Sequence, residues 1–134
     1  MNPETVRAWV RKAESDLKTA KDELATEEPA TDTVCFHAQQ CAEKYLKAVL
    51  VFHGAEIPRT HNIAELVHRC TRLDASFEGL YALKAQNLTD FAVTFRYPGD
   101  VLFPSIEEAQ EAVNVAEKVK AFVLDKLQQE GLQL

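Results

Sequence analysis

Apolar side chains recur at intervals of three and four residues between positions 34 and 52, and this spacing is the strongest constraint on the fold. The positions are Val34, Ala38, Cys41, Tyr45, Ala48 and Phe52. A helix with about 3.6 residues per turn places them all on one face, so the stretch predicts a long helix with a buried stripe. The whole sequence has 134 residues with only 4 glycines and 5 prolines, which favours long uninterrupted helices.

The same period predicts further helices before and after this one. We expect long helices at about residues 3–26, 74–96 and 105–131, and a short helix that begins at the capping box formed by Asn62 and Glu65. Ser105 and Glu108 form a second capping box at the start of the last helix. No stretch alternates with the two-residue period of a strand. The sequence therefore predicts an all-α fold, an up-down antiparallel bundle of four long helices plus one short helix, as a single domain over residues 1–134.

The net charge and the cysteine content indicate which partners and which cellular compartment to expect. A net charge of −6 disfavours extended nucleic-acid binding, because neutralisation of phosphates supplies most of that affinity. Three cysteines without close pairing do not indicate a disulfide framework, which favours a reducing, cytoplasmic setting. No apolar run reaches the roughly 18 residues of a membrane span, so we expect no membrane partner.

Metal and cofactor chemistry is not predicted. His37 and Cys41 are four residues apart and could hold a metal, but two ligands do not make a zinc site. Cys41 also belongs to the buried stripe, which favours a packing role. The sequence contains no glycine-rich phosphate loop, metalloprotease spacing or nucleophile elbow. We expect no cofactor, and the sequence does not identify a catalytic residue.

Polar residues from three parts of the chain form the predicted binding site. The second long helix carries a polar column with members about one turn apart, and Lys47 continues it. The loop before the short helix and the end of the fourth predicted helix add further groups. The predicted nucleotide-binding residues are His37, Gln40, Lys44, Arg59, His61, Arg96 and Tyr97. Arginine and lysine supply positive charge for a phosphate, and a histidine or tyrosine ring can stack on a base.

Several of these residues have a structural interpretation as well. Arg96 could complement a helix dipole, Arg59 could be a solvated loop charge, and His61 could stabilise a turn or act as a general base. Glu43 could orient Lys44 or Arg96, or form only an exposed ion pair worth less than about 1 kcal/mol. We interpret Trp9 as a core residue.

The motifs at these positions resemble the HEPN family, the higher eukaryotes and prokaryotes nucleotide-binding domain. They are Phe36–Lys44, then Gly54 with Ile57–Ile63, then Arg96–Gly99, with Trp9, Ala13 and Asp16–Leu17 in the first helix. The resemblance covers nearly the whole chain, and it implies a helical bundle that forms a homodimer. Some members of the family are RNases with an arginine followed four to six residues later by a histidine. No arginine of this sequence has a histidine at that spacing, so a metal-independent RNase of that type is not predicted.

The resemblance is greater to small standalone members whose fourth helix ends in Arg-Tyr-Pro. It implies a module that binds a nucleotide of the ATP or GTP class and acts with a minimal nucleotidyltransferase partner, in a toxin–antitoxin-like pair. Two alternatives remain open. The chain could be an RNase or toxin that uses Arg96 with His61 or His37, or a protein-interaction scaffold that binds no nucleotide.

Overall fold

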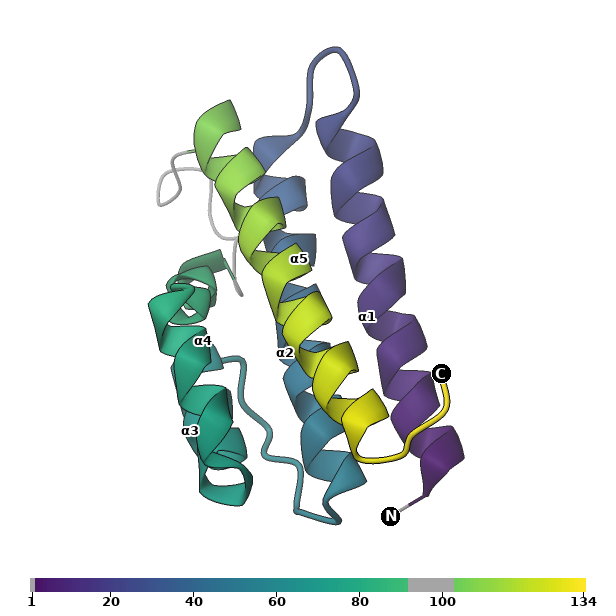
Figure 1. Ribbon diagram of the computed structural model, residues 1–134. Coiled ribbons are helices and arrows are strands. Elements are labelled where there is room, and N and C mark those ends of the chain that lie inside the picture. The colour runs from purple at the N-terminus through teal and green to yellow at the C-terminus, as the bar shows by residue number, and fades with distance from the viewer. Residues whose placement is uncertain (1, 92–102) are drawn as a thin grey trace.

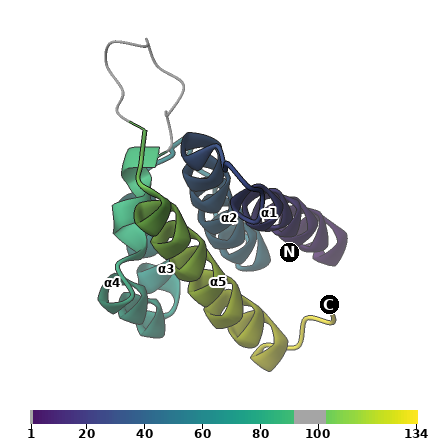
Figure 2. The ribbon, with the colours of Figure 1, turned by 90° about the horizontal axis from the view of Figure 1, so that it is seen from above.

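Three long helices form the frame of the protein. The computed structural model describes residues 2–91 and 103–134. Helices α1 (Pro3–Leu24), α2 (Thr31–Phe52) and α5 (Ile106–Gln129) lie side by side along their length (Figures 1 and 2). Helix α3 (Ile63–Leu73) packs against α2 on the side away from α1 (Figure 1). Every regular element in the described part of the chain is helical, which confirms the predicted all-α class.

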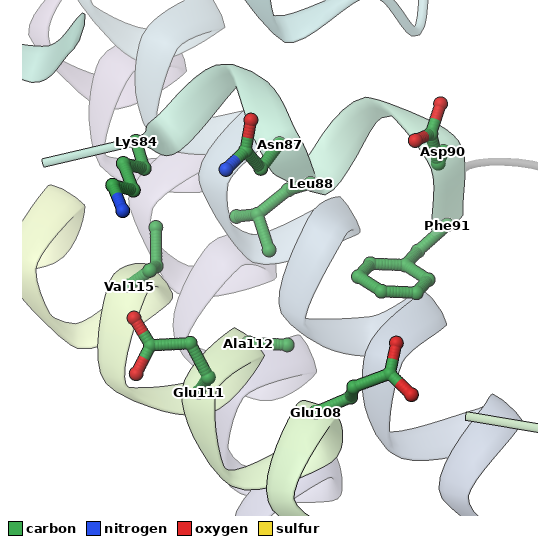
Figure 3. A pocket seen from close by; sticks show the side chains of 9 residues that line it. All are labelled: Lys84, Asn87, Leu88, Asp90, Phe91, Glu108, Glu111, Ala112 and Val115. Carbon is green, nitrogen blue, oxygen red and sulfur yellow. The ribbon is translucent and has the colours of Figure 1, made fainter. Parts of the chain in front are cut away.

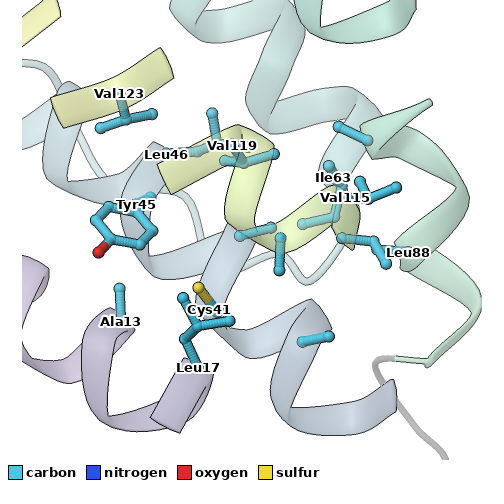
Figure 4. Close-up of a cluster of buried hydrophobic side chains, with 14 of the residues drawn as sticks. Ala13, Leu17, Cys41, Tyr45, Leu46, Ile63, Leu88, Val115, Val119 and Val123 are labelled. Carbon is cyan, nitrogen blue, oxygen red and sulfur yellow. The ribbon is translucent and has the colours of Figure 1, made fainter. Parts of the chain in front are cut away.

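Helix α2 is the central element because it contacts α1, α3 and α5. Five members of its predicted stripe are fully buried, namely Val34, Ala38, Cys41, Tyr45 and Ala48. Figure 4 shows the side chains of Cys41 and Tyr45 among residues from α1 and α5. The helix ends where Gly54 adopts a φ of +70°, a left-handed conformation that glycine reaches without a steric penalty. The sequence thus predicted the core face of α2 correctly.

The segment predicted as one long helix from Asp74 to Arg96 is divided into short turns as far as it is described. A 3₁₀ turn, η1 (Ala75–Glu78), is followed by the four-residue α4 (Gly79–Ala82) and a second 3₁₀ segment, η2 (Ala85–Phe91). Lys84 has a φ of +62°, which ends α4 before η2 begins.

The packing of η2 explains why a continuous helix was the wrong prediction for this segment. In η2 the residues that face the core are Ala85, Leu88 and Phe91, spaced by three, as a 3₁₀ helix with about three residues per turn requires. The same positions also fit an α-helical stripe over this short distance, so the sequence pattern did not separate the two structures.

The last helix begins as its sequence indicates. The Ser105 hydroxyl accepts a hydrogen bond from the Glu108 amide at 3.0 Å, and the Glu108 carboxylate accepts one from the Ser105 amide at 3.0 Å. This is the reciprocal capping box that the sequence predicted. Across residues 2–91 and 103–134, no helix combines the length and the apolar character needed to cross a membrane.

Candidate functional site

A buried aspartate of α1 holds two residues of the predicted polar column. Asp16 is buried, and its Oδ1 lies 2.8 Å from His37 Nδ1 while its Oδ2 accepts a hydrogen bond from Lys44 Nζ at 2.5 Å. His37 and Lys44 are each partly exposed. One carboxylate therefore fixes an imidazole and an ammonium group of α2 so that both remain accessible from outside.

A second buried carboxylate organises the other end of the column. Glu43 Oε2 accepts a hydrogen bond from Lys47 Nζ at 2.9 Å, and Oε1 lies 2.8 Å from His61 Nδ1 and 3.1 Å from Gln39 Nε2. The side chains of Glu43 and Lys47 are 5% and 9% exposed, whereas that of His61 is 64% exposed. The carboxylate thus links the interior of α2 to an imidazole on the surface.

The surroundings of Glu43 keep it ionised. Burial by itself raises the pKa of a carboxyl group, since it disfavours the charged form. Hydrogen bonds from Lys47, His61 and Gln39 outweigh this effect and lower the pKa of Glu43 below the ordinary value of 4.5. The result is a buried negative charge that is compensated on three sides.

Two amide side chains of α2 extend the group of hydrogen bonds around Glu43. Gln40 Nε2 donates to Gln39 Oε1 at 2.7 Å, and Gln39 Nε2 donates to the backbone carbonyl of His61 at 3.0 Å. We refer to two neighbouring hydrogen-bonded groups together as the polar network: Asp16 with His37 and Lys44, and Glu43 with Gln39, Gln40, Lys47 and His61. It contains four of the seven predicted site residues, namely His37, Gln40, Lys44 and His61.

Three predicted residues remain, namely Arg59, Arg96 and Tyr97. Arg59 is exposed, and its guanidinium makes no ion pair with any residue in the described ranges. Arg96 and Tyr97 lie outside the described residues. The predicted contribution of Arg96 and Tyr97 to the binding site therefore stays a prediction.

The predicted site residues did not include the buried half of the network, Asp16, Gln39, Glu43 and Lys47, although Lys47 was placed in the polar column. Asp16 had a visible signal, because it lies three residues after Ala13 and four before Ala20 on the apolar stripe of α1. The prediction that Glu43 orients Lys44 or forms an exposed pair is wrong, because Glu43 is buried and pairs with Lys47 and His61. Its alternative, that Glu43 orients Arg96, falls on a residue outside the described ranges. Lys47 is likewise buried, although its place in the polar column predicted an accessible side chain.

A cavity opens beside this network, between the first turns of α1 and Lys44. It has a volume of about 410 Å³ and is lined by Thr5, Ala8, Trp9, Lys12 and Lys44. The lining is mostly apolar, with two ammonium groups. Trp9 is only partly buried and forms part of this lining, so its interpretation as a simple core residue was incomplete.

A second cavity lies between η2 and α5 and has a different character. Its volume is about 480 Å³. Figure 3 shows Leu88 and Phe91 of η2 facing Ala112 of α5, with the carboxylates of Glu108 and Glu111 beside it. Three carboxylates against one ammonium group make this cavity a poor site for a phosphate.

The cysteines do not provide a reactive thiolate. Cys35, Cys41 and Cys70 are all buried. Burial raises the pKa of the Cys35 thiol to about 12, with further increases from Glu108 and Asp32, and burial alone raises that of Cys70 to about 12. Burial also raises the pKa of Cys41. No group of three or more metal-binding side chains is found among the described residues.

Comparison with known proteins gives consistent matches over nearly the full chain. The sequence model described as HEPN domain matches residues 6–127. A curated protein of Methanocaldococcus jannaschii, named "Putative toxin MJ1304", is 33% identical over 143 aligned positions that cover 93% of this chain and 92% of that protein.

Two crystal structures have the same fold. TT1696 from Thermus thermophilus superposes with a TM-score of 0.72 at 28% identity, covering 91% of this chain and 98% of that one. ST0689, described as an archaeal HEPN homologue, gives a TM-score of 0.71 at 27% identity, covering 91% and 97% of the two chains.

Proposed function

Because the chain belongs to the HEPN domain family, we propose that it is a nucleotide-binding module that acts in a toxin–antitoxin-like pair. The similarity to a protein named as a toxin supports the class of system. The observation that carries the binding role is the Asp16 arrangement, in which one buried carboxylate orients His37 and Lys44 toward the surface. Such a pre-organised pair can bind a phosphate with little loss of side-chain entropy.

The chemistry of the network suits an anion at its outer side. The Lys44 ammonium has three N–H donors and uses one of them for Asp16, so others remain for a ligand. The imidazole of His37 on α2 and that of His61 before α3 would add further hydrogen-bond donors. The proposed active form is a homodimer that presents its nucleotide, of the ATP or GTP class, to a minimal nucleotidyltransferase partner.

Isothermal titration calorimetry with ATP, GTP and a short RNA tests this function, using the protein alone and together with its co-purified partner. We expect saturable nucleotide binding that Lys44→Met weakens about tenfold or more, since a charge-assisted hydrogen bond contributes roughly 1.5–3 kcal/mol. The matched control is Lys18→Met, which removes an exposed lysine of α1 outside the network. Absence of binding in both preparations would reject the proposal. Sedimentation in the same buffer should give twice the mass of one chain.

A second function, cleavage of RNA, is favoured by one specific feature of the network. His37 and His61 each hold Nδ1 at 2.8 Å from a buried carboxylate, and each is accessible to solvent. A carboxylate that fixes an imidazole in this way can prepare it as a general acid or base, which contributes roughly 10²–10⁴-fold to a rate.

Incubation of the purified protein with end-labelled RNA separates this second function from simple binding. If it operates, cleavage should fall at least about 10²-fold in His61→Gln or His37→Gln. RNA that stays intact, or variants that cleave as fast as the parent, would eliminate it. We rank it second because no arginine of the chain has the histidine spacing of the RNase members.

A further inference from the structure

The cavity beside Lys44 lies next to the polar network and shares a residue with it. Thr5, Ala8, Trp9 and Lys12 are spaced by three or four along α1, so they form one helix face toward this cavity. Asp16 follows Lys12 by one further turn on the same helix, and its carboxylate binds the Lys44 ammonium. The cavity and the network are therefore two parts of one continuous surface.

We infer that this cavity is the subsite for the base of the bound nucleotide, with Trp9 as its stacking surface and Lys12 as a second phosphate-binding cation. The inference rests on the function proposed above, since it assigns the base of the same ligand. An indole ring presents a large flat surface to a nucleobase, and stacking of this kind tolerates different bases. Trp9 is only partly buried, and the lining residues Ala8 and Thr5 are small.

The charges at the cavity fit a nucleoside phosphate better than an apolar ligand. Lys12 is exposed and forms no ion pair with any residue in the described part of the chain. Lys44 keeps donors beyond the one that meets Asp16. Among the residues that the structure describes, no carboxylate lines the cavity. A volume of about 410 Å³ is in the range of small-molecule sites and can accept a base with part of its sugar.

The chain contains a single tryptophan, so its fluorescence reports directly on this subsite. We expect AMP, ATP and GTP to quench the Trp9 emission saturably, with the dissociation constant that calorimetry gives. Inorganic triphosphate, which has no base, should compete for binding without comparable quenching. If the Trp9 emission instead changes when the protein is diluted, and nucleotides do not affect it, this face of α1 serves self-association. That result would overturn the inference.

Variants of the lining residues separate this inference from the proposed function. Trp9→Leu should weaken nucleotide binding at least about fivefold, because stacking contributes roughly 1–3 kcal/mol per base, while Trp9→Phe should retain most of the affinity. Lys12→Gln should weaken binding about two- to fivefold at low salt, as expected for a solvent-exposed charge pair. Arg11→Gln is the matched control, since it removes the same charge from the neighbouring position outside the cavity.

The outcomes are distinct. If nucleotides bind by calorimetry but do not quench Trp9, and Trp9→Leu and Lys12→Gln bind like the parent, the subsite assignment is wrong and the proposed function stands. If no nucleotide binds the parent protein or its complex with the partner, both are wrong. Circular dichroism of Trp9→Leu checks its fold, and Lys12→Gln changes an exposed side chain, so the test does not depend on the larger substitution alone.

Discussion

Buried charge is the feature of individual residues that most distinguishes this protein from a plain helical bundle. Glu43 and Lys47 form an i,i+4 ion pair at 2.9 Å, with side chains 5% and 9% exposed. Lys18 and Asp22 form a pair with the same spacing on α1, but their side chains are 78% and 63% exposed. The two pairs share their spacing and one charge of each sign. They differ in order along the helix, and Glu43 also binds Gln39 and His61, but burial is the largest difference between them.

Removal of one member of the buried pair should be far more costly than removal of one member of the exposed pair. Glu43→Gln leaves the Lys47 ammonium buried without a counter-charge, so we expect a loss of about 3–5 kcal/mol in the free energy of unfolding. Asp22→Asn should cost less than about 1 kcal/mol. Urea denaturation followed by circular dichroism measures both.

A double variant provides the control for this prediction. Glu43→Gln/Lys47→Met removes both charges, so it should recover part of the stability that Glu43→Gln loses. If the double variant is less stable than the single variant, the loss does not come from an uncompensated lysine, and our account of the pair is wrong.

The sequence predicts a helix of this protein correctly where one face of that helix is apolar throughout. The core stripe of α2 and the Ser105 capping box were both predictable, because they depend on residues close together in the chain. The burial of Glu43 and Lys47 was not predictable, because it depends on tertiary contacts such as that of Glu43 with His61, which is 18 residues away in the chain. Among the site residues, His37 and Lys44 could be identified by their order on one helix, but their anchor Asp16 comes from another helix.

The break between α4 and η2 can be tested at Lys84, which has a φ of +62°. A left-handed conformation costs an L-residue roughly 1–2 kcal/mol, whereas glycine adopts it freely. Glycine also makes the unfolded chain more flexible, which offsets about 0.4–1 kcal/mol of this gain. On balance, Lys84→Gly should be more stable than Lys84→Ala by about 0.5–1 kcal/mol. Thermal unfolding compares the two variants. Greater stability of Lys84→Ala would show that this residue does not need the left-handed conformation.

At the scale of the whole molecule, the polar network makes stability depend on pH. The pKa of Glu43 is lower in the folded protein than its ordinary value of 4.5. The ionised Glu43 carboxylate therefore stabilises the folded protein fully above pH 4.5. This stabilisation is lost as the pH falls below 4.5 through the pKa of the folded state. Hydrogen bonds from Ser76 also lower the pKa of Asp74, so several carboxyl groups contribute to acid unfolding.

The contribution of Glu43 should be separable by comparing two proteins over the same range. Between about pH 6 and about pH 3 the parent should lose more unfolding free energy than Glu43→Gln/Lys47→Met, which has no titrating group at this position. Urea denaturation at a series of pH values gives the two curves. Parallel curves would mean that Glu43 has the same pKa in the folded and unfolded states.

The central claim is that the surface formed by α1 and α2 binds a nucleotide. It is tested most directly by two-dimensional NMR of the ¹⁵N-labelled protein titrated with ATP. The account predicts saturable shifts of the Trp9 indole and of the amides of Lys12, Asp16, His37 and Lys44, with little change at Leu88 and Ala112 around the cavity between η2 and α5. Shifts centred on that second cavity, or none at either place up to millimolar ATP, would contradict it.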